Sequence, residues 1–229
     1  MPPPSAPFPL LYTYRRCPYA MRARMALHIG GVAFDAYEIV LRAKPPALLE
    51  ASPKATVPVL VLDRQQPIAQ SWEIVCWALT RPAAPLPARR WWDGADHPAN
   101  RALLECNDTL FKHHLDRYKY PERFSAETRV RSQSEALEQA MSLFLEPLEL
   151  RLQQARFLGG EAPCATDIGI FPFVRQFAAV DPNAFAALPL PRVRDWLAHW
   201  LQSNLFQAIM VKWPPNTVRH FEGTSPDGH

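Results

Sequence analysis

The chain has 229 residues, of which 48% are hydrophobic and 21% are charged, and its formal net charge is +3. This composition excludes intrinsic disorder for most of the chain, and the small, dispersed charge argues against nucleic acid as a partner. A chain of this length buries roughly 70% of the surface that its unfolded form exposes, so it needs neither a metal nor a disulfide to fold. No apolar run reaches the ~18 residues of a membrane helix, and residues 1–12 lack the basic and apolar regions of a signal peptide. We therefore expect a cytoplasmic globular protein with no membrane partner.

The first forty residues predict a strand, a helix and a second strand. Residues 8–14 are apolar and aromatic without helical spacing, as in a strand. Residues 18–29 begin with a proline, carry apolar side chains at helical spacing and end before two glycines. Residues 32–40 predict the second strand. A strand, helix and strand in this order are typical of a right-handed parallel crossover.

The next forty residues predict a short helix, two strands and another helix. Residues 45–51 suit the short helix, and the apolar run 57–63 suits a buried strand with a proline at its second position. Residues 67–69 predict a short fourth strand in a hairpin, after which Ser71 is expected to cap a helix. The predicted order βαβ–α–ββ–α thus occupies residues 8–80.

Beyond residue 80 the sequence predicts only helices. Residues 81–92 contain three prolines without periodicity and are expected to link two domains. The polar tail, 214–229, is expected to be loosely held. The predicted domains are therefore a first domain at residues 1–80 and an all-helical domain at residues 93–229. The predicted helices of the second domain lie near 97–118, 126–156, 164–180, 190–203 and 204–212.

The four cysteines lie too far apart for a CxxC pair or a zinc site, so we expect reduced thiols and no metal. Three of them fall in apolar helical patterns, where cysteine acts as a small buried hydrophobe. These three are Cys76, Cys106 and Cys164.

Cys17 differs because it lies where the first strand leads into the first helix. There it faces free backbone N–H groups and the positive end of the helix dipole, and Arg15 and Arg16 add positive charge. These influences favour the nucleophilic thiolate. The alternative is a thiol that only begins the helix. Because Ala20 stands where a second cysteine would allow an internal disulfide, such a site needs a partner thiol to release a mixed disulfide.

Three further positions are candidates for ligand binding. We expect a cis peptide bond at Val57–Pro58, which would expose the backbone of Val57 to an extended peptide; the alternative is an ordinary strand-start proline. Ser71 begins a helix, so its hydroxyl and the nearby N–H groups suit a carboxylate, or it is a plain cap. Lys44, taken alone, is a solvated lysine.

Together these residues resemble the glutathione transferase superfamily, in which a thioredoxin-like domain precedes an all-helical domain. Residues 17–20 (CPYA) are similar to the CPFA-type motif of the cysteine-type omega class. Residues 41–60 (LRAKPPALLEASPKATVPVL) are similar to the omega pattern of a lysine-proline pair followed by VPVL. The resemblance covers about residues 8–213 and implies an α/β plus all-α fold with glutathione as co-substrate.

The resemblance also implies roles for individual residues. Cys17 would bond or contact the glutathione sulfur, and Val57, next to cis Pro58, would pair its backbone with the tripeptide. Ser71 would hold the γ-glutamyl carboxylate. Lys44 matches the lysine that approaches glutathione in the omega class. Gln70 replaces the usual acidic residue, so it hydrogen-bonds the γ-glutamyl ammonium without charge assistance.

The capping box of the second domain departs from the family pattern, and two tyrosines are alternative candidates for the catalytic role of Cys17. The helix-capping box of the second domain reads Cys164-Ala165-Thr166-Asp167, in which Asp167 matches as a buried structural cap and Cys164 replaces a serine. Tyr12 and Tyr14 lie near the place of the catalytic tyrosine in other members. With Cys17 present, we expect both tyrosines to be packing residues.

The resemblance places the second-substrate site between the first-domain cleft and the first helices of the second domain. The polar band at residues 107–118 suits that cleft, a dimer partner or simply a solvated helix face. The superfamily implies a homodimer. Aromatic surface for such an interface is offered by Trp72, Trp77, Trp91 and Trp92, for which core packing is equally consistent.

Three functions remain open from the sequence. The leading hypothesis is a glutathione-dependent thiol transferase or reductase that uses Cys17, with a disulfide or small electrophile as substrate and dehydroascorbate-type reduction included. The second is conjugation of glutathione to electrophiles, with glutathione as the nucleophile. The third is a non-catalytic glutathione-binding or regulatory protein.

Overall fold

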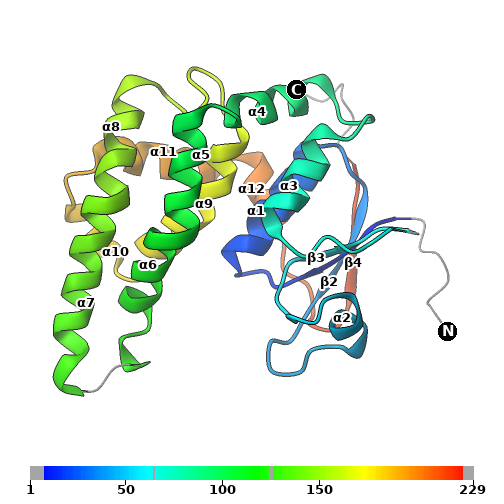
Figure 1. Cartoon of the computed structure of the whole chain (residues 1–229), viewed down its shortest axis with the longest axis horizontal. Helices are drawn as coiled ribbons and strands as arrows, with labels where there is room; N and C mark the ends of the chain where they lie inside the picture. Colours follow the sequence, from blue (N-terminus) through cyan, green and yellow to red (C-terminus); the bar gives the residue numbers. More distant parts are fainter. Residues whose placement is uncertain (1–7, 64, 124–125, 224–229) are drawn as a thin grey trace. The chain divides into compact units, whose positions relative to one another are not determined.

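The computed structural model describes residues 8–63, 65–123 and 126–223, except for the side chains of residues 126–131. The chain forms two units (Figure 1). The first unit contains the chain up to Trp92 together with the segment from Ser203 onward, and the second is Asp93–Gln202. The segment after Ser203 therefore groups with the N-terminal residues, whereas the sequence pattern assigned it to the helical domain.

The first unit contains a mixed four-stranded sheet in the order β3-β1-β2-β4. Strands β1 and β2 are parallel and are joined through α1 (Pro18–Ile29), which confirms the predicted crossover. β3 pairs antiparallel with β1, and β4 pairs antiparallel with β2. The strands are β1 (Leu10–Thr13), β2 (Phe34–Glu38), β3 (Val59–Val61) and β4 (Val218–Phe221).

Helices cover both faces of this sheet because side chains alternate along each strand. On one face Tyr12 and Val59 form a buried cluster with Leu48 of α2 (Pro46–Ala51). On the other face Thr13 contacts α1, which lies beside α3 (Ser71–Thr80) in Figure 1. The thioredoxin-like arrangement predicted for the first domain is thus present.

Strand β4 corrects the expectation of a loosely held tail. Its register places Phe221 opposite Phe34, and the two rings stack with centroids 4.9 Å apart. His220 Nδ1 lies 2.8 Å from Asp35 Oδ1. Only one of the four residues of β4 is buried, so the segment has no local strand signal and depends on its pairing with β2.

Three local boundaries also differ from the predictions. The fourth strand expected at residues 67–69 is an isolated bridge, in which Ile68 and Leu60 exchange two backbone hydrogen bonds of 2.9 Å. Gln70, not Ser71, is the N-cap of α3, and Ser71 is the first helical residue. The segment expected as a linker contains part of α4 (Leu86–Ala95).

The second unit is helical, as predicted. Its first two long helices each contain a π-helical turn and lie side by side (Figure 1). The sequence missed α10, although Asp181 caps it by accepting from Ala184 N at 2.9 Å and Pro182 begins it. The elements are α5 (Pro98–Cys106), η1 (Asn107–Phe111), α6 (Lys112–Lys119), η2 (Pro121–Arg123), α7 (Ala126–Ala140), η3 (Met141–Leu145), α8 (Glu146–Gln154), α9 (Ala165–Ala178), α10 (Pro182–Ala187) and α11 (Pro191–Gln202). The last helix of the chain, α12 (Asn204–Ile209), belongs to the first unit.

Asp167 is a buried hydrogen-bond centre of the second unit, as expected of a structural cap. Its carboxylate accepts from Cys164 N at 2.9 Å, from Leu158 N at 3.1 Å and from Trp196 Nε1 at 2.8 Å. Burial raises the pKa of Asp167, and the donated hydrogen bonds act in the opposite direction. One side chain thus joins the start of α9 to the preceding loop and to α11.

None of the helices that the structure describes combines the length and apolar character needed to span a bilayer.

Candidate functional site

A cavity of about 460 Å³ in the first unit brings together all six site residues that the sequence proposed. The chain reaches it at four places: the start of α1, the loop before α2, the turn before β3 and the start of α3. Four well-separated segments therefore supply one site. The six residues are Cys17, Lys44, Val57, Pro58, Gln70 and Ser71.

Cys17 is the N-cap of α1 and is only partly buried. Its backbone is extended, with φ −72° and ψ 123°, and Pro18 begins the helix. Cys17 Sγ lies 3.6 Å from the carbonyl oxygen of Val57, to which it donates. The thiol therefore lies at the positive end of the helix dipole and faces the turn that carries the proline.

Arg24 supplies a buried positive charge near this thiol. It donates to Thr13 Oγ1, to the Arg15 carbonyl at 2.9 Å and to the Ile209 carbonyl at 3.2 Å. Burial lowers the pKa of Arg24 to about 10, and electrostatic interactions with Glu38 and Cys17 oppose this lowering. Arg24 is thus cationic at neutral pH, and its interaction with Cys17 favours the thiolate.

The peptide bond between Val57 and Pro58 is cis, which confirms that prediction. The same turn carries Ala55 in the left-handed region at φ 51°. The turn contributes Ala55, Thr56, Val57 and Pro58 to the lining of the cavity that contains Cys17.

Ser71 is buried, and its Oγ accepts a hydrogen bond of 2.9 Å from Arg22 Nε. The guanidinium of Arg22 lies 5.2 Å from the ring centroid of Tyr19 and 5.7 Å from that of Trp72. Because the oxygen of Ser71 accepts from Arg22, its proton is available to a carboxylate in the cavity.

Sequence reasoning missed Arg22, since an arginine on an amphipathic helix is normally solvated. The local signal that was available is the i, i+3 spacing of Tyr19 and Arg22, which brings an aromatic ring beside a guanidinium. Arg24 carries no comparable signal. Its partners in the C-terminal segment are 185 and 186 residues away in sequence.

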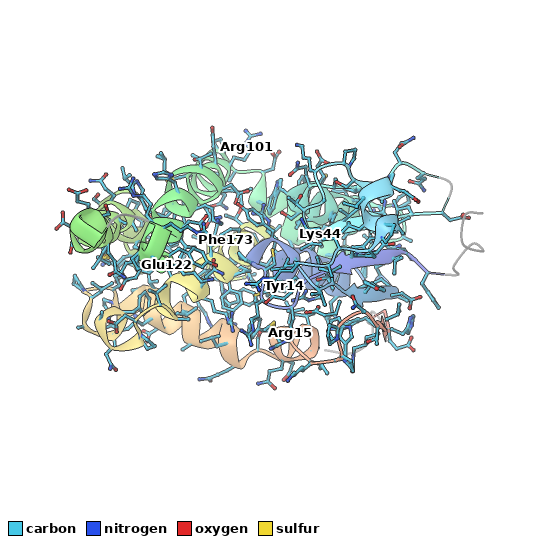
Figure 2. All side chains as sticks on the ribbon, turned by 90° about the horizontal axis from the view of Figure 1, so that it is seen from below. Tyr14, Arg15, Lys44, Arg101, Glu122 and Phe173 are labelled. Atoms are coloured by element: carbon cyan, nitrogen blue, oxygen red, sulfur yellow. The ribbon has the colours of Figure 1, made fainter. Side chains whose placement is uncertain are left out.

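Lys44 and Gln70 are exposed and complete the polar lining of the cavity. Figure 2 labels Lys44 together with Tyr14 and Arg15 in this unit. Among the described residues, the lining includes neither Tyr12 nor Tyr14. Tyr12 is buried in the β1–α2 cluster, as expected of a packing residue, and Tyr14 packs against this cluster but also lines a neighbouring cavity.

The polar band at residues 107–118 lies in the second unit and is mostly half-buried, with Asn107 and Tyr118 buried and His113 exposed. Lys112 and Asp116 form an i, i+4 ion pair, and Asn107 Nδ2 donates to Asp108 Oδ1 at 2.8 Å. Within the described ranges, no group of three or more potential ligands could hold a metal ion. Of the tryptophans considered for an interface, Trp72 and Trp92 pack on each other with ring centroids 5.8 Å apart.

Comparison with protein families gives matches to both halves of the chain. Residues 16–81 match "Glutathione S-transferase, N-terminal domain", and residues 123–199 match "Glutathione S-transferase, C-terminal domain". Glutathione S-transferase omega-1 of Mus musculus is 25% identical over 207 residues, which cover 89% of this chain and 77% of that protein. The omega-1 protein of Sus scrofa is 25% identical over 217 residues, which cover 92% of this chain and 83% of that protein.

Solved structures show the same fold at low identity. A glutathione transferase family member from Pseudomonas fluorescens with two glutathione bound superposes with a TM-score of 0.74. It is 17% identical, and the match covers 91% of this chain and 95% of that one. The theta class glutathione S-transferase of Xanthomonas axonopodis pv. citri with glutathione bound gives a TM-score of 0.67 at 19% identity, covering 91% and 99% of the two chains.

Proposed function

Since the chain belongs to the glutathione S-transferase family and is a glutathione transferase, we propose that it is a thiol transferase of the cysteine type, similar to the omega class. Its nucleophile is the Cys17 thiolate, and its substrates are mixed disulfides or small glutathionyl electrophiles. The proposal includes a cytoplasmic location and a homodimer.

The observation that carries the proposal is the placement of Cys17 in one cavity with the cis Val57–Pro58 turn and the start of α3. Both the helix dipole and the charge of Arg24 favour the thiolate at this position. A thiolate in a cavity that also offers backbone and hydroxyl groups suits a peptide that contains sulfur.

We assign the groups of glutathione to the cavity as follows. The backbone of Val57 pairs with the cysteinyl unit, and the hydroxyl of Ser71 with the N–H groups of α3 holds the γ-glutamyl carboxylate. Gln70 accepts from the γ-glutamyl ammonium, and Lys44 faces the glycyl carboxylate. Arg22 orients Ser71 through their hydrogen bond and is a positioning residue.

In the proposed reaction, the Cys17 thiolate attacks the glutathionyl sulfur of a mixed disulfide. The bond between the two substrate sulfurs breaks, and the released thiolate takes a proton from water. A second thiolate then attacks the glutathionyl sulfur on Cys17, which returns Cys17 as a thiolate and leaves a new disulfide in solution. Ala20 provides no second thiol, so the second thiolate comes from outside the chain.

Formation of a glutathione adduct on Cys17 tests the proposed function directly. Reduced protein incubated with oxidised glutathione should gain the mass of one glutathionyl group, which added glutathione removes. The Cys17→Ser variant should gain none, whereas Cys106→Ser should behave as the parent because burial raises the pKa of the Cys106 thiol. A parent protein that forms no adduct at neutral pH would overturn the proposal and favour conjugation or a binding role.

The Gln70→Glu variant should bind glutathione several-fold more tightly than the parent. A carboxylate would add charge assistance to the hydrogen bond with the γ-glutamyl ammonium, worth about 1 kcal/mol at this exposed position. Calorimetric titration of reduced glutathione into variants that also carry Cys17→Ser measures the effect without disulfide chemistry. Gln66→Glu adds the same charge at an exposed position outside the cavity and should leave the affinity unchanged. Equal affinities for Gln70→Glu and Gln66→Glu would remove Gln70 from the binding site.

A further inference from the structure

The first unit has a second cavity, of about 440 Å³, which the mechanism above does not use. It is formed by the loop before α1, the end of β2 with the loop that follows, and the segment between α12 and β4. Its chemical character comes from six of the residues that line it, namely Arg15, Arg16, Glu38, Arg42, Lys212 and Trp213.

Four of these residues are cationic. Arg16, Arg42 and Lys212 are exposed, and Arg15 is partly buried. No salt bridge joins the four side chains to residues in the described part of the chain. Four positive charges gathered at one cavity favour an anionic ligand with more than one negative group.

Two buried polar atoms of the same lining have no hydrogen-bond partner among the described residues: Glu38 Oε2, an acceptor, and Trp213 Nε1, a donor. Both residues are more than nine-tenths buried. The other carboxylate oxygen of Glu38 accepts from Arg15 N at 2.9 Å, so the side chain is held in place. Since buried polar groups are normally paired, these atoms suit a ligand that both donates and accepts.

This cavity adjoins the one that contains Cys17. Leu41 lines both cavities and is exposed. Arg15 and Arg16 directly precede Cys17 in the chain. A molecule held in the second cavity therefore lies next to the segment that carries the nucleophile.

We propose that the second cavity binds a second molecule of glutathione, the thiol that releases Cys17. This inference rests on the proposed thiol-transferase function. Glutathione carries two carboxylates and one ammonium. The carboxylates match the cationic side chains and the indole N–H of Trp213, and the ammonium matches the unpaired oxygen of Glu38. Its thiolate attacks the glutathionyl sulfur bound to Cys17, the bond to Cys17 breaks, and Cys17 leaves as a thiolate. The products are oxidised glutathione and the reduced enzyme.

Release kinetics test this assignment. The glutathione adduct of Cys17 is prepared with oxidised glutathione, freed of excess reagent and mixed with either glutathione or 2-mercaptoethanol, a neutral thiol. An Arg42→Gln, Lys212→Gln double variant should slow release by glutathione tenfold or more and change release by 2-mercaptoethanol less than twofold. Arg90→Gln with Arg101→Gln removes the same charge from exposed positions outside both cavities and should change neither rate. Equal slowing with both thiols, or no slowing with glutathione, would overturn the proposal.

The indole N–H of Trp213 gives a finer test. Trp213→Phe keeps the ring packing but removes the donor, so it should raise the glutathione concentration needed for half-maximal release several-fold and leave the maximal rate unchanged. A lower maximal rate with an unchanged half-maximal concentration would contradict binding through Trp213.

Binding stoichiometry tests the site without any reaction at Cys17. By calorimetry, the Cys17→Ser protein should bind two molecules of reduced glutathione per chain, and the same protein with Arg42→Gln and Lys212→Gln should bind one. One molecule in both proteins would overturn the second site and leave the thiol-transferase proposal standing. Failure of the parent to form any Cys17 adduct would refute the thiol-transferase function. The binding stoichiometry would then decide whether the second glutathione site exists.

Discussion

The Cys17→Ser variant should lose thiol transfer, with kcat/KM for a glutathione mixed disulfide reduced roughly a thousandfold or more. A serine hydroxyl has the shape of the thiol but is not ionised at neutral pH, so the helix dipole and Arg24 have no thiolate to stabilise. The measurement is the glutathione-dependent reduction of the disulfide between glutathione and 2-mercaptoethanol. Oxidised glutathione is recycled by an added reductase that consumes NADPH.

The controls for this variant separate chemistry from folding. Cys106→Ser should retain at least half of the parent's rate, because Cys106 lies in the second unit and its thiol donates only to the Leu143 carbonyl at 3.4 Å. Glutathione affinity should survive in Cys17→Ser, since Ser71 and the Val57 turn are untouched. Full turnover in Cys17→Ser would refute the nucleophile. A gain of conjugating activity in Cys17→Ser would show that the scaffold also activates glutathione.

The Asp167→Ala variant should lose about 4 kcal/mol of unfolding free energy, the largest stability effect expected in the second unit. The substitution leaves three buried donors unpaired, on Leu158, Cys164 and Trp196, and it opens space at the start of α9. Urea unfolding followed by tryptophan fluorescence and by circular dichroism measures the change.

Asp181→Ala is the matched comparison for that loss. Asp181 also caps a helix, but it is exposed and accepts one hydrogen bond, from Ala184 N. Its removal should cost about 1 kcal/mol. Equal losses for the two variants would mean that Asp167 acts only as a helix cap and that its bonds to the loop and to α11 add nothing.

The sequence predicted the elements that have local signals. The predicted bounds of the helix at residues 18–29 are confirmed. Pro18 occupies its first position and Gly30 its C-cap, and both residue types are common signals of helix ends. Strand β4 was missed because three of its four residues are exposed and its partner is distant in sequence. Helix α10 was missed although Asp181 and Pro182 form a normal helix start, since it is only six residues long.

The candidate site was predictable to the extent that its residues lie at element ends. Cys17, Pro58 and Ser71 each stand at such an end, and the structure brings them into one cavity. Arg24 was not predictable, because it is a buried charge whose partners come from other segments. Arg22 had only the weak local signal of its spacing from Tyr19, and its hydrogen bond to Ser71 is not local. Glu38 occupies a buried position in the alternation of β2, where an apolar residue is normal, and burial raises the pKa of its carboxyl.

The pairing of β2 with β4 has a consequence for synthesis of the chain. Asp35 and His220 are 185 residues apart, and the whole second unit is translated between them. Until β4 leaves the ribosome, the outer edge of β2 presents unpaired N–H and C=O groups. Since domains generally fold in the order of their synthesis, the N-terminal unit would then mature after the unit inserted within it. During that interval the unpaired edge of β2 is open to pairing with strands of other chains.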